Sequence, residues 1–408
     1  MSCPRPAEVL SPHWIHVLHN PEDEKEDRRY FYPEFVEFCY GSGRNAGMDI
    51  WRMPVGREVP ALSWGGNCPV LLKELTLYLL PYDIVVYSLE TYIESSDMND
   101  FTSAMSRLRT LSFYDRERCP ELYESAAVPL TEAFRKLSPG SGRTGTVSFG
   151  SLLENGNKLK IFQITNASGL SALDSRRKDF LLFELGTVSR IGSCENKGSD
   201  GIAEEYIDGL LAGGKLCFYN NWTALSLFDT FTILADNAPD WLVMNWRSSY
   251  FRMIYLHSLF LKFYLFRLNM RFRKGCFKAS ALDDELLAFE NKYCFHKISY
   301  NFLPLQIYKA IDRSFEISEE REQLYHLIAM ESRQAEEKND RKVNSLLLFL
   351  TLLTMFSTIW DTTSLLNELY PYSDYVGSSV IGFRAATSLI SLLILAVISG
   401  IFLRRRKI

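Results

Sequence analysis

Two long apolar stretches lie near the carboxyl end of the chain. Residues 343–360 read VNSLLLFLTLLTMFSTIW and residues 385–403 read AATSLISLLILAVISGIFL, and neither stretch contains a charged residue. At about 1.5 Å per residue, each is close to the length that an α-helix needs to cross a hydrocarbon core about 30 Å thick. The pattern predicts two transmembrane helices, at 343–360 and 380–403. The alternative interpretation is a pair of buried helices in a soluble protein.

Charged residues around the two stretches predict their orientation. Lys338, Arg341 and Lys342 precede the first stretch, and the tail at 404–408 contains three Arg and one Lys. The connecting loop at 361–379 contains no Lys or Arg. Because basic residues are retained on the cytoplasmic side of membranes, both ends are expected in the cytoplasm and the loop outside. The sequence therefore predicts a multi-pass protein of the cell's inner (plasma) membrane.

Polar residues recur at helical spacing along the first predicted span. On an ideal helix they fall within an arc of about 100°, and they are Asn344, Thr351, Thr354, Thr358 and Asp361. Such a stripe needs either neighbouring helices or a water-filled pore, and both explanations stay open at this point. Since two spans per chain cannot enclose a conduit, a pore requires a homo-oligomeric ring in which each subunit contributes one stripe.

The predicted outer loop is acidic. It carries Asp361, Glu368 and Asp374, and no basic residue balances them within 361–379. Repeated around a ring, these carboxylates are expected to attract cations to the outer mouth of a pore.

Long helices are predicted between residues 239 and 342, upstream of the first span. No Pro or Gly occurs from Leu305 to Tyr370, and the segment 331–342 is polar on every side. A helix of that kind is solvated all round or lines a wide aqueous vestibule. The expected helices are 240–274, 282–299 and a stalk at 305–360 that runs unbroken into the first span, with Pro304 separating the last two.

The first 238 residues mix two periodicities and predict an α+β (α/β-type) cytoplasmic domain. Stretches rich in Val, Ile, Phe and Tyr are expected to be strands, and they are 32–40, 49–53, 83–89, 158–165, 179–188 and 216–219. Helices are expected between them at 99–111, 121–137 and 202–211. The pattern leaves the strand order open.

Charge and cysteine usage exclude several classes of protein. Residues 338–408 contain eight Lys or Arg and four Asp or Glu, whereas the rest of the chain contains 37 and 45. An acidic domain joined to a basic, apolar tail argues against direct nucleic-acid binding. The eight cysteines are scattered singly, which favours reduced thiols over disulfides or a zinc site. No hydrolase, metalloprotease or phosphate-loop motif occurs, so we expect no enzyme.

A glycine-rich segment supplies one candidate ligand contact. Residues 140–145 read GSGRTG, which matches the letters of a dinucleotide-binding fingerprint. That fingerprint needs a strand before it and a helix after it, and the reverse order is predicted here. A flexible loop is therefore the first interpretation, and a phosphate contact by Arg143 is the alternative.

An α/β domain, a stalk helix entering the first span, an acidic outer loop, a second span and a basic tail together resemble the CorA-like divalent-cation channel superfamily. The resemblance is specific mainly from residue 282 onward. It implies a homopentamer in which the first transmembrane helix lines the pore, with Asn344, Thr351, Thr354 and Thr358 facing it. The family's Gly-Met-Asn signature is absent, because 360–367 reads WDTTSLLN. Magnesium selectivity of that kind is therefore not implied.

Divergent CorA-like proteins that lack this motif accompany type III CRISPR systems as antiviral membrane effectors. The chain is similar to that branch in its enlarged cytoplasmic domain and in residues 219–230, YNNWTALSLFDT. The resemblance implies a nucleotide second messenger, of the S-adenosylmethionine–AMP type, as gating ligand. Trp222 would stack on a base and Asn220 or Asn221 would read its edge. The alternative is an ordinary turn with a buried tryptophan.

Together these features predict a homo-oligomeric cation channel gated from its cytoplasmic domain, as an antiviral effector opened by a nucleotide. One alternative is a homeostatic transporter of Mg²⁺ or another divalent metal. Another is a non-conducting membrane anchor or scaffold, for which the polar stripe serves packing only. The sequence identifies no resident metal site.

Overall fold

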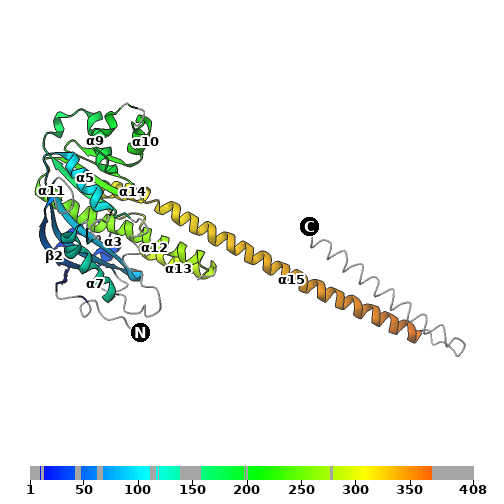
Figure 1. The fold of residues 1–408 in the computed structure, drawn as a ribbon. Helices are drawn as coiled ribbons and strands as arrows, with labels where there is room; N and C mark the ends of the chain where they lie inside the picture. Colours follow the sequence, from blue (N-terminus) through cyan, green and yellow to red (C-terminus); the bar gives the residue numbers. More distant parts are fainter. Residues whose placement is uncertain are drawn as a thin grey trace. The chain divides into compact units, whose positions relative to one another are not determined.

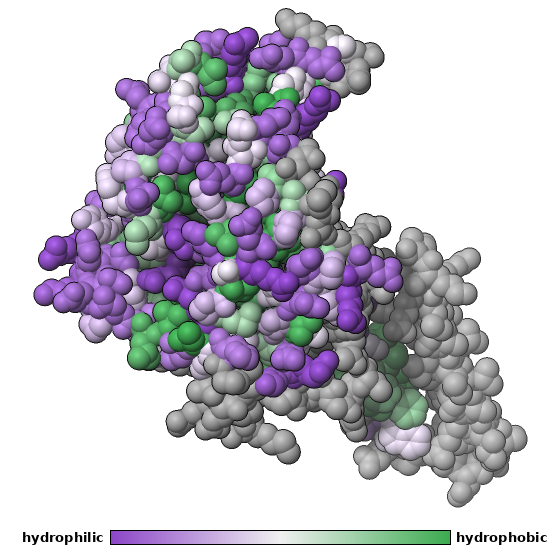
Figure 2. Space-filling model, turned by 60° about the vertical axis from the view of Figure 1, so that its left-hand side comes forward, coloured by the Kyte–Doolittle hydropathy of each residue, from purple (hydrophilic) through white to green (hydrophobic). Residues whose placement is uncertain are grey.

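The computed structural model describes residues 10, 13–41, 47–61, 68–110, 116–117, 119–137, 158–196, 198, 201–275 and 279–369. The chain divides into two compact units, Met1–Tyr325 and His326–Ile408. The first unit is a mixed α+β fold, and the described part of the second is one long helix (Figure 1). Hydrophilic residues dominate the face of the first unit seen in Figure 2, with hydrophobic residues in smaller groups among them.

The first sheet is antiparallel throughout and has the order β1-β2-β3-β4. Its strands are β1 (Ile15–His16), β2 (Asp49–Val59), β3 (Val70–Leu80) and β4 (Ile84–Ile93). A turn of 3₁₀ helix, η1 (Pro81–Asp83), joins the last two. In β3, Leu72, Leu75 and Leu77 have no exposed surface, so this strand forms the centre of the sheet's buried face.

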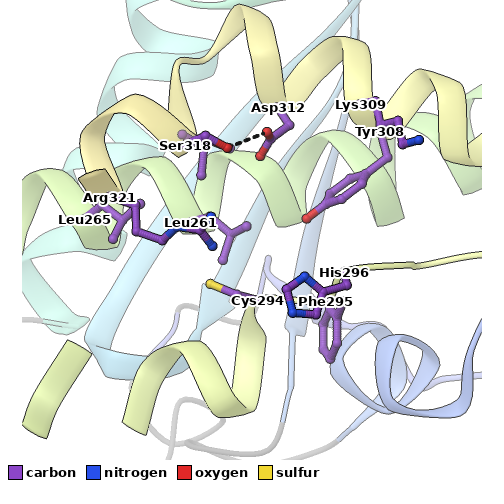
Figure 3. A pocket seen from close by; sticks show the side chains of 11 residues that line it. Leu261, Leu265, Cys294, Phe295, His296, Tyr308, Lys309, Asp312, Ser318 and Arg321 are labelled. Carbon is purple, nitrogen blue, oxygen red and sulfur yellow. Dashed lines mark hydrogen bonds between the residues drawn. The ribbon is translucent and has the colours of Figure 1, made fainter. Parts of the chain in front are cut away.

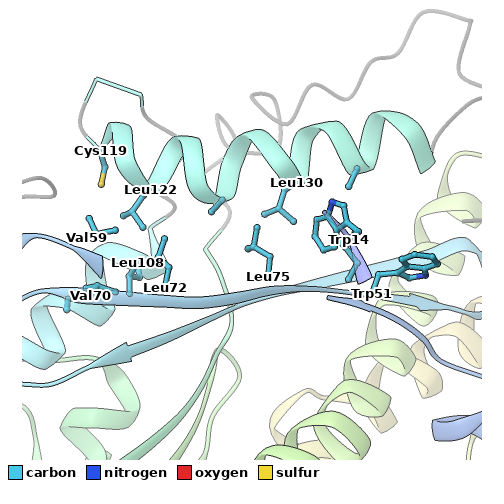
Figure 4. Close-up of a cluster of buried hydrophobic side chains, with 14 of the residues drawn as sticks. Trp14, Trp51, Val59, Val70, Leu72, Leu75, Leu108, Cys119, Leu122 and Leu130 are labelled. Atoms are coloured by element: carbon cyan, nitrogen blue, oxygen red, sulfur yellow. The ribbon is translucent and has the colours of Figure 1, made fainter. Parts of the chain in front are cut away.

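Helices cover one face of the first sheet, and a hydrophobic core lies between these helices and the sheet. The helices are α5 (Met98–Arg109) and a continuous run made of α6 (Pro120–Leu122), the π-helical η3 (Tyr123–Ala127) and α7 (Val128–Leu137). Figure 4 shows this run lying along the sheet, with Leu122 directed toward Leu72 and Leu108, and Leu130 directed toward Leu75. Burial of these apolar side chains between the helices and the sheet supplies the main stabilising contribution of this half.

The second sheet is mixed and has the order β5-β8-β7-β6. Its strands are β5 (Ile161–Ala167), β6 (Lys215–Tyr219), β7 (Trp222–Ser226) and β8 (Thr230–Asp236), with β5 parallel to β8. Two helices, α9 (Ser175–Thr187) and α10 (Glu204–Gly214), and the short turns η4 (Leu170–Ala172) and η5 (Ser193–Glu195) accompany it. The buried amide of Gln163 donates to the Leu185 carbonyl at 2.8 Å and to Thr232 Oγ1 at 2.6 Å.

Long helices complete the first unit, together with the short α2 (Pro21–Asp27) and α3 (Pro33–Tyr40). One continuous helix consists of α11 (Asp240–Asn245), the π-helical η6 (Trp246–Tyr255) and α12 (Leu256–Arg273). It is followed by α13 (Ala279–Tyr293), α14 (Phe302–Ser314) and α15 (Ile317–Leu369). The rings of Tyr264 in α12 and Phe289 in α13 stack at 3.8 Å, so an aromatic contact joins these two helices.

Two predicted strands are wrong. The residues expected as a strand at 32–40 form α3, in which Pro33 occupies the first turn and Phe35, Val36 and Phe38 are buried. The strand expected at 179–188 is helical as far as Thr187 and forms most of α9, with Val188 as its C-cap. Asp174 caps that helix by accepting a hydrogen bond from the Arg177 amide at 2.8 Å. The helices expected at 99–111, 121–137, 202–211 and 240–274 are confirmed within a few residues.

The prediction of an unbroken helix from residue 305 to residue 360 is also wrong. The helix is interrupted at Phe315 and Glu316, and we call these two residues the joint. Glu316 has a φ of 54°, a left-handed conformation that no helix continues through. Phe315 is fully buried, so the interruption directs an aromatic side chain into the core. Pro304 lies in the first turn of α14, where a missing backbone donor costs no helical hydrogen bond.

Candidate functional site

The apolar part of α15 is exposed along its length. An 18-residue window of this helix has a mean hydropathy of 1.7 and is 0 % buried. Leu346, Phe349 and Trp360 are 61 %, 61 % and 66 % exposed. Among the described residues, α15 is the helix long and apolar enough to cross a membrane. The second predicted span, at 380–403, lies outside the described residues.

All five residues of the predicted polar stripe lie on α15 and are exposed within the single chain: Asn344, Thr351, Thr354, Thr358 and Asp361. The threonine hydroxyls donate to carbonyl groups of their own helix. Thr351 Oγ1 lies 2.7 Å from the Leu347 oxygen, and Thr354 Oγ1 lies 2.9 Å from the Thr351 oxygen. Thr358 donates in the same way to the Thr354 carbonyl. Because each hydroxyl proton is used internally, the oxygen atoms offer acceptor lone pairs outward.

The acidic residues of the predicted outer loop are described only in part. Asp361 is exposed on α15, and Ser357 Oγ lies 3.5 Å from its Oδ2 atom. The helix continues to Leu369, so residues 361–369 are helical where a loop was expected. Glu368 is therefore part of α15, although its side chain is not described, and Asp374 lies outside the described residues.

The first turns of α15 are held within the first unit by charged and polar contacts. Lys262 Nζ on α12 lies 2.7 Å from Glu320 Oε1, and both side chains are largely buried. Arg321 forms an ion pair with Glu290 of α13 at 3.6 Å, and the Tyr325 hydroxyl donates to the other oxygen of Glu290 at 2.6 Å. These contacts attach α15 to α12 and α13 directly after the joint.

The ammonium groups of two lysines, Lys160 and Lys262, lie close to the Phe228 ring near the joint. Lys160 Nζ lies 3.9 Å from the Phe228 ring centroid, 4.8 Å from that of Phe315 and 3.7 Å from Asp229 Oδ1. Lys262 Nζ is 5.3 Å from the same Phe228 ring. Burial lowers the pKa of Lys160 to about 8, while the neighbouring Asp229 carboxylate acts in the opposite direction. The charges of these groups are therefore partly desolvated and depend on one another.

The candidate ligand residues lie at a tight hairpin rather than at a turn between a strand and a helix. Asn220 and Asn221 form the exposed turn between β6 and β7. Trp222 is only 3 % exposed, and its ring packs edge-on against Trp246 with centroids 5.4 Å apart. The asparagine side chains are therefore accessible to a ligand, whereas both faces of Trp222 are covered. Arg143 lies outside the described residues.

Sequence reasoning missed the contacts around the joint. Lys262 is visible in the sequence as a charge inside an aromatic helix, and this is the signal from which a buried ion pair could have been inferred. Its partner Glu320 lies 58 positions further along the chain in a segment rich in charge, so no local pattern connects the two. The backbone reversal at Glu316 had no signal, because neither Gly nor Pro marks it.

No protein-family model, no curated protein and no solved structure matches the chain. Among the residues that the structure describes, no group of three or more His, Cys, Asp or Glu side chains is placed to hold a metal ion. The residues of α15 and of the first unit are therefore the basis for inferring what the chain does.

Proposed function

We infer that the chain is a homo-oligomeric cation channel of CorA-like architecture, gated from a cytoplasmic first unit. In this proposal α15 crosses the membrane as the pore-lining helix, residues 380–403 form the second span, and both termini are cytoplasmic. A nucleotide second messenger opens the pore. The observation that carries the proposal is that one helix is anchored in the first unit and continues as an exposed apolar helix with a polar stripe.

The exposure of α15 supports a membrane and a ring of copies as its surroundings. A soluble monomer rarely leaves a contiguous apolar surface of this extent uncovered. In the membrane, lipid covers Phe349 and Phe356, which are 61 % and 52 % exposed in the single chain. The stripe lies on the other side of the helix, where neighbouring copies would place their own stripes around a common axis.

The hydroxyl geometry supports cations as the permeant species. The Thr351, Thr354 and Thr358 hydroxyls already donate to backbone carbonyls, so a passing ion meets oxygen lone pairs rather than protons. Oxygen ligands are those that Mg²⁺ and other hard cations prefer. The exposed carboxylate of Asp361, three residues beyond Thr358, adds negative charge at one end of the stripe.

The same hydrogen bonds also favour a second candidate function. A threonine that satisfies its hydroxyl on its own helix can face lipid or pack against another helix without a pore. This geometry would suit a non-conducting anchor or scaffold. The two functions differ in whether the hydroxyl of Thr354 affects ion flux.

Ion flux through the purified full-length protein in liposomes tests the proposal. Wild-type flux of Mg²⁺ and K⁺ is measured without nucleotide and with an S-adenosylmethionine–AMP conjugate. The Thr354→Leu variant should lose flux at least about tenfold, because removing a polar group raises the barrier by more than about 1.4 kcal/mol over the ring. Thr354→Ser, which keeps the hydroxyl, should retain flux, and so should Phe349→Leu on the opposite face.

Each outcome of this assay has a defined meaning. Flux that requires the nucleotide supports the gated effector, whereas flux without nucleotide that internal Mg²⁺ suppresses supports homeostatic transport. Full flux in Thr354→Leu refutes the assignment of the stripe to a pore. A folded, inserted wild-type protein that conducts neither ion refutes the channel and leaves the scaffold.

A further inference from the structure

A cavity of about 170 Å³ lies beside the joint, within the first unit. Its walls come from α12, from the segment that follows α13, from α14 and from the first turns of α15 (Figure 3). Polar side chains that line it include those of Tyr308, Lys309, Asp312, Ser318 and Arg321, together with Cys294 and His296. Because α14 and α15 each contribute to the wall, an occupant of this cavity contacts both helices across the joint.

Tyr308 directs an unused donor into the cavity. Its side chain is only 7 % exposed, and in Figure 3 its hydroxyl points toward the middle of the space. No side chain or backbone group in the described part of the chain forms a hydrogen bond with this hydroxyl. Burial raises its pKa, so the group stays protonated and remains a donor. The hydroxyl is therefore free to donate to an acceptor placed in the cavity.

Arg321 approaches the same space from the opposite side (Figure 3). Its nearest carboxylate oxygen, Glu290 Oε1, is 3.6 Å away, which is beyond hydrogen-bond range. The guanidinium group carries five N–H donors in a planar fork that matches the oxygens of a phosphoryl or carboxylate group. Two donors from different helices, Tyr308 and Arg321, therefore converge on one space.

The surrounding charge favours an anion. Lys309 and His296 are both exposed and line the cavity, so an ammonium group lies beside it. The Asp312 carboxyl accepts a hydrogen bond from Ser318 Oγ at 3.2 Å. Burial raises the pKa of Asp312, while the hydrogen bond from Ser318 and the charge of Arg321 act in the opposite direction. The carboxyl group of Asp312, which lines the same cavity, is thus already engaged by Ser318.

The size of the cavity limits what enters it. Sites for whole drug-sized ligands measure about 300–1,000 Å³, so 170 Å³ accommodates a single group. A phosphoryl group offers several oxygens to an Arg fork and a tyrosine hydroxyl at once. Any remaining part of a ligand would extend outward past Lys309 and His296.

We propose that this cavity binds the phosphoryl group of a small molecule, with Arg321 and Tyr308 as its donors, and that binding links α14 to α15 across the joint. Binding itself is independent of the channel. The consequence for gating rests on the proposed function: a ligand that prefers one arrangement of the joint shifts the pore toward the matching state.

Isothermal titration of the detergent-solubilised full-length protein tests binding, with inorganic phosphate and AMP as the two probes. Arg321→Gln should weaken binding of the better probe at least tenfold. Tyr308→Phe, which preserves the ring and removes one donor, should weaken it severalfold. The matched control is Arg313→Gln on α14, whose guanidinium bonds the Gly213 carbonyl instead of lining the cavity, and this variant should bind as wild type does.

The two probes distinguish the source of the phosphoryl group. Equal affinities indicate free phosphate, and at least tenfold tighter AMP binding indicates a nucleotide whose phosphoryl group occupies the cavity. Hydrogen exchange at residues 302–325 should slow when the better probe is added to wild type, and it should slow less in Arg321→Gln at the same probe concentration. Absence of saturable binding at millimolar concentrations of both probes overturns the proposal, as does unchanged binding in both cavity variants.

Flux measurements separate this proposal from the channel itself. Saturable binding in a protein that never conducts refutes the proposed function and leaves the phosphoryl site standing. Conduction by a protein that binds neither probe refutes the site and leaves the channel standing.

Discussion

Replacing Lys262 by Met should loosen the first turns of α15. The Lys262 ammonium lies 2.7 Å from Glu320 Oε1, and the two side chains are 10 % and 18 % exposed. Glu320 Oε2 is buried without a hydrogen-bond partner among the described residues, so the carboxylate depends on this lysine. At an effective dielectric constant of about 20, a pair at this distance attracts by about 6 kcal/mol.

Most of that attraction offsets the cost of removing both charges from water, so the net contribution of the pair is small. Removing only the lysine is different, because it leaves a buried carboxylate unpaired. Such a change costs about 3–5 kcal/mol. The residual exposure of both groups places the expected loss at the lower end, about 3 kcal/mol. The double variant Lys262→Met/Glu320→Leu buries no charge and should recover most of this loss.

Amide hydrogen exchange in the full-length protein measures this effect locally. Amides of residues 317–325 should exchange on the order of a hundredfold faster in Lys262→Met, since about 1.4 kcal/mol corresponds to a factor of ten. The control Arg28→Met removes an exposed ion pair with Glu24 and should leave these amides unchanged. The reasoning fails if the amides of residues 317–325 exchange at the wild-type rate in Lys262→Met. It also fails if they exchange faster in the double variant than in Lys262→Met.

Further predictions concern the cores of the first unit. Burial lowers the pKa of His257 to about 4, against 6.5 when exposed, so its contribution to stability is complete above pH 6.5 and falls toward pH 4. Urea unfolding should show a loss of about 2 kcal/mol between pH 7.5 and pH 5 that His257→Gln lacks. Gly214→Ala would place a Cβ atom 2.3 Å from the Ser226 carbonyl oxygen and should cost about 1–3 kcal/mol. The control is Gly213→Ala, whose added Cβ atom has no neighbouring atom within 4 Å, and this variant should not lower the melting temperature. Leu75→Ala, at a fully buried position, should lower the free energy of unfolding by about 3 kcal/mol in the same assay.

Two features of the secondary structure that the sequence did not predict share one physical origin. The segment Val70–Leu80 reads VLLKELTLYLL, which is rich in leucine, yet it forms β3 because β2 and β4 pair with it on both sides. Residues 179–188 have strand-like composition but lie in α9, whose amino terminus is capped at Asp174. In both segments, contacts outweighed composition, as expected where intrinsic preferences differ by less than about 1 kcal/mol per residue.

The two candidate sites differ in how far the sequence alone predicts them. The polar stripe was predictable because Thr351, Thr354 and Thr358 belong to one uninterrupted helix, where spacing alone determines which side chains share a face. The cavity beside the joint was not predictable, because Tyr308 and Arg321 come from different helices. Their convergence depends on the reversal at Glu316, which has a φ of 54°.

The sequence by itself determined the apolar helix, its stripe and the mixed α+β class of the chain, because these follow from the local periodicity of side chains along the backbone. Only the tertiary structure decided that β3 is a central strand, that the long helix breaks at the joint, and that Lys262 meets Glu320. These features depend on contacts between residues far apart in the chain, whose free energies exceed local preferences and leave no local pattern.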